Sequence, residues 1–317
     1  MLAGAVVLLI AAGGLVKSLE AGLAVPDWPL SYGSLNPPRW WTIENVRAEH
    51  GHRLLAGTVA LFTVGLAVWA SRREERRWVR RLAWLAVATV LAQAILGGIT
   101  VLFFLPTAIS VSHAALAQAF LCLVTALAVV TSRGWLKPGT EELRSGRDVV
   151  ARARHAAVLT ALIYVQILLG AVMRHIGAGL AIADFPLVFG GLFPPQMSFA
   201  IGIHYAHRVG AVVVAVAAFW LLFRLARAPR AGRARDGLAR WALGSLILLQ
   251  IGLGGAVVLT ARSPLVNTIH VATGAAVLAL SLVLSLTLAR RASVAREHAP
   301  KSLVQERRTM AREAEVT

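Results

Sequence analysis

The sequence predicts an all-α membrane protein with eight transmembrane helices, arranged as two pseudo-symmetric four-helix bundles. Of its 317 residues, 57% are apolar, and the mean hydropathy of +0.69 is higher than that of ordinary soluble domains. Apolar runs of about 20 residues, the length that crosses a bilayer, recur along the chain. The chain also resembles itself at an offset of 157 residues, which indicates an internal repeat.

The apolar runs are rich in Ala and Leu and do not alternate with period two, which favours helices over strands. A helix also satisfies its own backbone hydrogen bonds, as the bilayer interior requires. The predicted spans cover about 2–19, 53–70, 82–102, 112–131, 156–173, 203–223, 241–260 and 268–289.

The basic residues predict the topology. The net charge is +17, and 25 of the 32 Lys and Arg residues lie in segments 71–81, 132–154, 224–240 and 290–317. By the positive-inside rule these segments and both termini are cytoplasmic, so the active face is expected outside the plasma membrane. The outward loops are 20–52, 103–111, 174–203 and 261–267. This alternation speaks against nucleic-acid binding and favours contact with anionic lipid.

The repeat predicts two halves, 1–140 and 150–290, joined by the linker 132–154 and followed by a cytoplasmic tail, 291–317. An even number of spans in each half makes the repeat parallel. The glycine pairs Gly97-Gly98 and Gly254-Gly255 are expected to allow close helix approach. At an offset of 157, Gly22-Leu23-Ala24 recurs as Gly179-Leu180-Ala181, Leu96-Gly97-Gly98 as Leu253-Gly254-Gly255, and His113 as His270. At an offset of 155, Glu49, His52 and Arg53 match His204, His207 and Arg208.

Four histidines are predicted in the first turn or so of the spans that start at the outer surface: His52, His113, His207 and His270. Each half contributes two imidazoles from facing helices, which suits the axial ligation of a haem iron. A lone membrane histidine is more often a hydrogen-bonding residue, but two repeat-related pairs favour haem. A bare zinc ion needs three or four ligands, whereas a proton relay stays open. The single cysteine, Cys122, excludes an intramolecular disulfide.

Charged neighbours of these histidines have two readings. Arg53, Arg208, Lys17 and Arg174 either pair with haem propionates or extend to the lipid headgroups. Glu49 shares a helix face with His52 and is the candidate proton acceptor, or else it is a carboxylate favoured by the helix dipole. The second half has His204 at this place. The remaining histidines, His50, His155, His175 and His298, are expected to be ordinary polar or surface residues.

Together these motifs resemble the haem A synthase family over nearly all of 1–290. The matching motifs are Gly-Leu-Ala-Val-Pro-Asp-Trp-Pro at 22–29, Glu-x-x-His-Arg at 49–53, His-x-x-His-Arg at 204–208, and the single histidines of the fourth and eighth spans. Many members carry a cysteine pair in the first outer loop. This chain has none and carries Ser31 after Pro29-Leu30, which puts any thiol-dependent step in question.

The resemblance implies oxidation of a ring methyl of haem O to a formyl group, with electrons leaving through a second haem. It implies that His52 and His113 flank the substrate haem O and that Glu49 is catalytic. It also implies that His207 and His270 bind a resident haem B. The implied partners are haem O synthase and terminal oxidase assembly proteins, beside membrane lipid and a second copy of the chain.

Two other functions remain open from the sequence. A bis-histidine di-haem b-type cytochrome needs the four ligands but not Glu49. A haem carrier for oxidase assembly needs only reversible binding.

Overall fold

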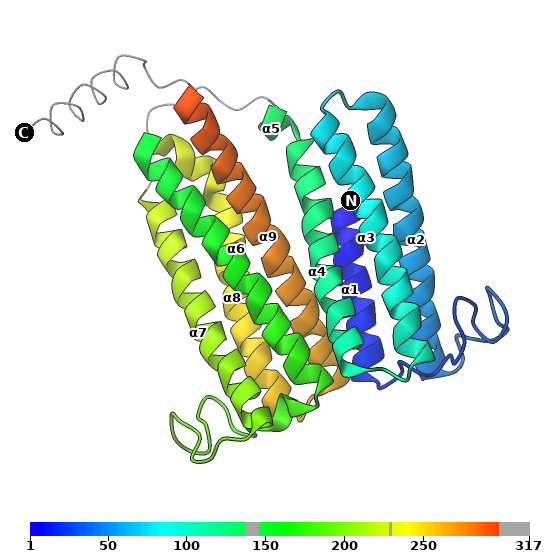
Figure 1. The fold of residues 1–317 in the computed structure, drawn as a ribbon. Helices are drawn as coiled ribbons and strands as arrows, with labels where there is room; N and C mark the ends of the chain where they lie inside the picture. Colours follow the sequence, from blue (N-terminus) through cyan, green and yellow to red (C-terminus); the bar gives the residue numbers. More distant parts are fainter. Residues whose placement is uncertain (137–145, 228–229, 298–317) are drawn as a thin grey trace, which may run out of the picture.

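The computed structural model describes residues 1–136, 146–227 and 230–297, and within these ranges the protein is helical and has no β-sheet (Figure 1). The helices are α1 (Leu2–Ser18), α2 (Glu44–Arg73), α3 (Arg77–Leu102), α4 (Thr107–Val130), α5 (Arg133–Leu136), α6 (Gly146–His175), the 3-10 helix η2 (Ala178–Leu180), α7 (Phe199–Ala226), α8 (Arg230–Leu259) and α9 (Pro264–Glu297).

Among the described residues, seven helices are long and apolar enough to cross a membrane. The exception among the predicted spans is α1, an apolar helix of 17 residues. Its length of about 26 Å is slightly less than the roughly 30 Å of a hydrocarbon core. Large apolar side chains such as Phe62, Trp69, Val216 and Trp220 are exposed on the helices. This exposure is unfavourable in water and expected in lipid, and the prediction of a helical membrane protein is confirmed.

Several helices extend beyond the predicted spans. Helix α2 begins at Glu44 and not at 53, and α9 continues to Glu297 and not to 289. The apolar pattern misses these turns because they are polar, although Glu44 suits a helix N-terminus electrostatically. Helix α9 therefore takes in the first part of the predicted tail, whereas 298–317 and linker residues 137–145 lie outside the described residues.

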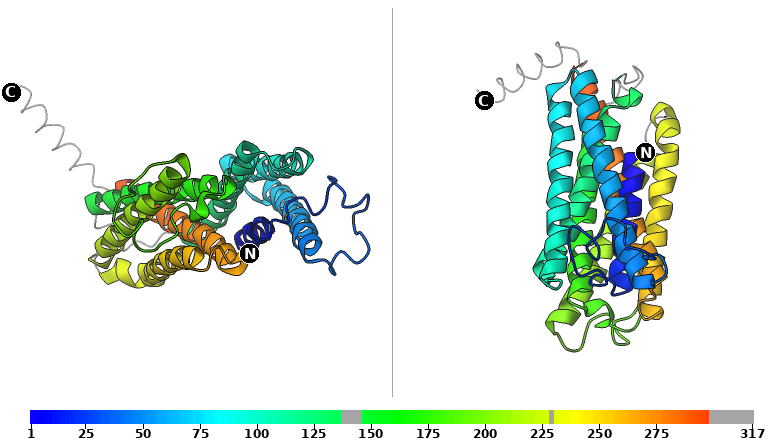
Figure 2. Two further views of the ribbon diagram at one scale, coloured as in Figure 1. Left: turned by 90° about the horizontal axis from the view of Figure 1, so that it is seen from below. Right: turned by 90° about the vertical axis from the view of Figure 1, so that its right-hand side faces the viewer.

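The long helices form two groups, α1–α4 and α6–α9 (Figures 1 and 2). Each group has its own apolar core. The first includes Val59, Val79, Phe120 and Leu121, and the second includes Leu159, Leu221, Leu243 and Leu278. Helix α9 packs against α1 and α4 as well as α6 and α8, so it joins the two groups.

Two long loops, 19–43 and 176–198, lie at the same end of the helices, and α5 and the end of α9 lie at the other (Figure 1). Each loop contains one isolated β-bridge, Ser31 with Ser34 and Val188 with Gly191. Each also has the same left-handed backbone before its glycine, with φ of 52° at Tyr32 and at Phe189. The two loops therefore bring the same local fold to the end of each helix group that carries the candidate histidines.

Candidate functional site

The four candidate histidines lie deeper in their helices than predicted, but at matched depth. His52 and His207 each follow the first residue of α2 and α7 by eight positions, and His113 and His270 follow that of α4 and α9 by six. The expected location in the first turn was wrong because the apolar runs begin after the helices do. His52 and His113 belong to helices of the first group, and His207 and His270 to helices of the second. The structure thus places each predicted pair within one helix group at matched depth.

Each of the four rings packs against a glycine of a neighbouring helix. A Cβ atom placed on these glycines would lie 2.9–3.3 Å from the ring atom Cε1, closer than an ordinary contact. The pairs are His52 with Gly13, His113 with Gly97, His207 with Gly170, and His270 with Gly254. The glycines therefore leave room for the Cε1 edge of each imidazole against the adjacent helix, where a larger residue would displace the ring.

Buried ring nitrogens support a ligand role. In the described part of the chain, Nδ1 of His52, His113 and His270 is buried and has no hydrogen-bond partner. An unpaired buried polar atom is costly, so it indicates a missing partner. The described residues contain no cluster of three or more metal-binding side chains. A pair of imidazoles therefore fits an iron porphyrin, which needs only two axial ligands, better than a bare metal ion.

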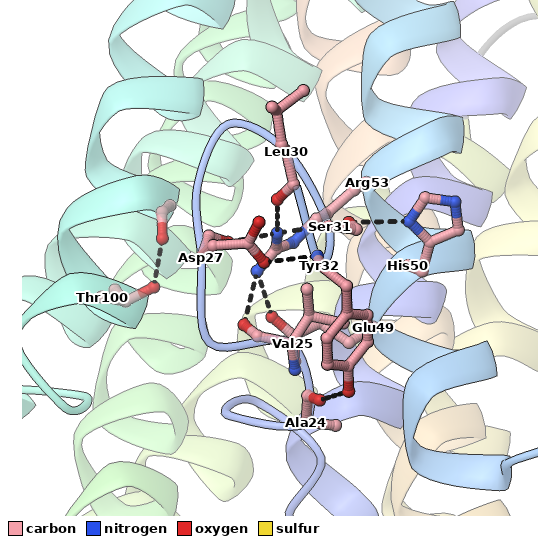
Figure 3. Close-up of polar contacts among 11 residues, drawn as sticks. Ala24, Val25, Asp27, Leu30, Ser31, Tyr32, Glu49, His50, Arg53 and Thr100 are labelled. Carbon is pink, nitrogen blue, oxygen red and sulfur yellow. Dashed lines mark hydrogen bonds and ion pairs between the residues drawn. The ribbon is translucent and has the colours of Figure 1, made fainter. Parts of the chain in front are cut away.

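Glu49 is almost fully buried, at 3% exposed. Its Oε2 accepts a hydrogen bond from the Val25 backbone N–H at 2.8 Å, and its Oε1 pairs with Arg53 Nη2 at 2.6 Å. Glu49 lies beyond the first turn of α2, so the helix dipole does not account for its position. Figure 3 shows this carboxylate between α2 and the first long loop.

His204 occupies the equivalent position in the second half. Its Nδ1 lies 3.3 Å from the Ile182 backbone N–H and its Nε2 lies 3.2 Å from Arg208 Nε. A neutral imidazole has only one acceptor nitrogen, so it satisfies one of these donors. A carboxylate satisfies both donors and retains unused lone pairs. The two halves thus place the same two donors at this position but differ in the side chain that accepts their hydrogen bonds.

Arg53 and Arg208 hold the loops by their backbone carbonyl groups. Arg53 donates to the carbonyls of Asp27 at 2.7 Å and Leu30 at 2.8 Å. Arg208 donates to those of Asp184 at 2.6 Å and Leu187 at 2.8 Å. These contacts engage much of each guanidinium group, so the arginines fasten the loops to α2 and α7.

The other two basic candidates lie where the halves meet. Arg174 at the end of α6 donates to the Gly14 carbonyl at 2.6 Å and to Ser18 Oγ at 2.7 Å, both on α1. Lys17 is half-buried on the last turn of α1. Arg174 thus connects the second half to the helix that carries Gly13.

Aspartates shape both loops. Asp27 accepts hydrogen bonds from the backbone N–H groups of Gly33 and Tyr32, and Asp184 accepts those of Gly190 and Phe189. These donors, Gly33 and Gly190 foremost, lower the pKa of each carboxyl below its ordinary value.

The aromatic ring after each loop aspartate packs on a helix glycine. A Cβ atom on Gly98 would lie 2.5 Å from the Trp28 ring, and one on Gly255 would lie 2.6 Å from the Phe185 ring. These glycines therefore make room for the loop side chains. The sequence had led us to expect only a close approach of helices there. The contacts hold both loops over the histidine sites.

Several residues near the sites were not singled out from the sequence. His50, expected to be an ordinary polar or surface residue, is buried, and its Nδ1 lies 2.8 Å from Ser31 Oγ. Gln166 Nε2 lies 3.1 Å from Nδ1 of His207, and Gln250 Nε2 lies 3.4 Å from Nε2 of His270. The recurrence of Gln93 as Gln250 was a signal for the second amide. Nothing in the repeat indicated Gln166, because its counterpart is Leu9.

Comparison with known proteins identifies what this site resembles. The family model for COX15-CtaA, described as cytochrome oxidase assembly protein, matches residues 1–127 and 48–284. A haem A synthase of Symbiobacterium thermophilum is 31% identical, over 80% of this chain and 82% of its own length. One from Shouchella clausii is 31% identical, over 82% and 85%. One from Agrobacterium fabrum is 29% identical, over 78% and 77%.

Proposed function

The chain belongs to the COX15-CtaA family of cytochrome oxidase assembly proteins, and from this premise we propose how it acts as a haem A synthase. It is a multi-pass membrane oxidoreductase of oxidase assembly. Its reaction converts haem O into haem A by oxidising a ring methyl to a formyl group. The observation that carries the assignment of sites is the presence of Glu49 in one half only, beside two matched pairs of half-buried histidines.

The first half holds the substrate. His52 and His113 flank haem O, and Glu49 accepts a proton that leaves as the methyl group is oxidised. Two contacts support this role for Glu49. Arg53 and the Val25 N–H fix the carboxylate in place, and two donors leave it with free lone pairs. When bound, the iron porphyrins supply the electron chemistry.

The second half holds a resident haem B between His207 and His270. Support comes from the missing carboxylate and from Gln166, which lies beside His207 and has Leu9 as its first-half counterpart. Gln250 lies beside His270, and its first-half counterpart is Gln93. Neighbours of this kind orient ligand rings in metal sites. A haem B held by His207 and His270 would supply a route for the electrons that the oxidation removes.

The remaining assignments follow from the same proposal. The halves 1–140 and 150–290 form a parallel repeat in the plasma membrane, with both termini inside and the long loops outside. Supporting this, the described parts of the basic segments, 71–81, 132–136, 146–154, 224–227, 230–240 and 290–297, lie at the opposite end of the helices from the long loops. Lys17 and Arg174 pair with haem propionates. Arg53 and Arg208 contribute the guanidinium N–H groups that the loop carbonyls do not occupy. Haem O synthase and oxidase assembly proteins are the partners, with a homo-oligomer as the assembly.

Haem extraction and chromatography of the purified protein test the proposal, with and without a co-expressed haem O synthase. We expect haem B in both preparations, and haem O and haem A only in the preparation with co-expressed haem O synthase. Haem B alone in both would replace the proposal with a b-type cytochrome. Substoichiometric haem that is lost on washing would replace it with a carrier.

A further inference from the structure

A groove lies between α1 and α2 at the first-half site. It has a volume of about 250 Å³, and His52 forms part of its wall. Its apolar wall comes from Ala12 and Leu15 of α1 and from Ala48 and Gly51 of α2, and Leu19, Glu44 and Arg47 complete the lining. We call this the α1–α2 groove. A groove that reaches a candidate iron ligand offers a path from the side of the helix bundle to the metal position.

We propose that the α1–α2 groove is the lateral access route and binding groove for the apolar edge of the substrate porphyrin. This inference rests on the proposed function, because it takes His52 as a ligand of the substrate haem. Haem O carries a long isoprenoid substituent, so it dissolves in lipid and approaches a site from within the bilayer. Apolar walls beside a half-buried imidazole match such a molecule.

Three residues that line the groove have bulkier counterparts in the second half. The contacts of His52 with Gly13 and of His207 with Gly170 align α1 with α6. In this alignment the second half has Leu169 where the first has Ala12, Ile203 in place of Ala48, and Ala206 in place of Gly51, whereas Leu15 and Arg47 have the smaller counterparts Val172 and Gly202.

Of the three bulkier residues, Leu169 extends towards the neighbouring helix. Leu169 Cδ1 lies 3.7 Å from a Cβ placed on Gly210, so its side chain points towards α7. A Cβ placed on Gly51 meets only Trp40 Cζ3, at 3.8 Å.

This difference matches the different demands on the two sites. A substrate has to reach its site and leave it as product in every turnover, whereas a resident cofactor stays. Ala12, Ala48 and Gly51 leave room beside His52 in the first half, and their second-half counterparts are bulkier. We therefore expect these three positions to favour exchange in the first half and retention in the second.

The test copies the second half into the first. The variant Ala12→Leu/Ala48→Ile/Gly51→Ala fills the groove. A matched control, Gly4→Leu/Gly57→Ile/Gly65→Ala, adds the same kinds of group on exposed positions of the same helices, where a Cβ meets no atom within 4 Å. Both proteins are purified from cells without haem O synthase and mixed with ferric haem O in phosphatidylcholine vesicles. Haem O uptake is followed by absorbance.

We expect the groove variant to retain the b-type spectrum of the second half and to take up haem O at least roughly tenfold more slowly, because the filled space resists further packing. The control should take it up like wild type. Wild-type uptake by the groove variant, or equal slowing in the control, would overturn the inference. Absence of uptake by the wild-type protein would instead overturn the proposed function.

A reversible block gives an independent result if the triple variant folds poorly. Ala48→Cys in a Cys122→Ala background leaves one thiol, at the groove. An alkyl methanethiosulfonate should stop haem O uptake, and a phosphine reductant should restore it. The same label on Gly65→Cys should have no effect. Unchanged uptake by the labelled Ala48→Cys protein would contradict the access route.

Discussion

The two halves differ at few places within a shared frame. Both fasten a long loop to the second helix of the half through an arginine, Arg53 or Arg208, and both pack each histidine on a glycine. In each half, a loop N–H and the arginine both donate hydrogen bonds to one side chain of this helix. That side chain is Glu49 in the first half and His204 in the second. A common scaffold thus presents a carboxylate at one site and an imidazole at the other, and the proposed division of roles between the halves rests on this difference.

The largest effect is expected from substituting the histidines of one site, which should abolish haem binding there and leave the other site intact. His207→Ala or His270→Ala should abolish the resident low-spin b-type spectrum, because each removes one axial bond. His52→Ala or His113→Ala should leave that spectrum intact and abolish haem O binding. Optical and electron paramagnetic resonance spectra per mole of folded protein measure both. A double variant of His207 and His270 with the wild-type spectrum would refute the assignment of the second half.

Glu49→Gln tests the main asymmetry. The amide preserves the shape and can still accept the Val25 N–H, but it lacks the charge that pairs with Arg53. We expect haem occupancy in both halves, and haem A formation about 10²–10⁴-fold slower, the usual contribution of a positioned base.

Haem O or a partly oxidised intermediate should accumulate in Glu49→Gln, as extracted pigments would show. The matched control is His204→Gln, which should leave the turnover nearly unchanged. A normal yield of haem A from Glu49→Gln would remove the catalytic role and favour the cytochrome.

The sequence predicted what the repeat and the helical spacing encode. It identified the four histidines, the Glu49 and His204 difference, and the two loops. It did not predict the burial of His50 or the position of Gln166, because these depend on which side chain of another element lies opposite. It treated Gly97-Gly98 as a helix contact, whereas these glycines receive the rings of His113 and Trp28. The spacing of residues predicts which side chains share a helix face. Which residues of another element contact that face depends on the packing.

The glycine contacts allow a finer comparison of the two sites. Gly13→Ala and Gly170→Ala place a methyl group 3.0 and 2.9 Å from Cε1 of His52 and His207, respectively. Overpacking of this kind costs about 1–3 kcal/mol. Gly170→Ala should alter the b-type spectrum and lower haem B occupancy, whereas Gly13→Ala should weaken only haem O binding. Gly57→Ala, whose methyl meets no atom within 4 Å, is the control. Equal effects of all three variants would show that ring placement is not the cause.

The smallest difference between the halves is expected in their response to acid, because both loops use the same aspartate. Hydrogen bonds from Gly33 and Gly190 lower the pKa values of Asp27 and Asp184 from an ordinary 3.8. A lowered pKa in the folded state means that the stabilisation is complete above pH 3.8 and is lost as the pH falls through the folded value. Amide exchange in loops 19–43 and 176–198 should therefore be slow at pH 7. After correction for the intrinsic rate, exchange should become faster in both loops together below pH 3.8. Asp27→Asn should release only the first loop at neutral pH, and Asp184→Asn only the second. If either variant loosened both loops, the halves would be coupled at this end and the comparison between them would no longer separate two independent sites.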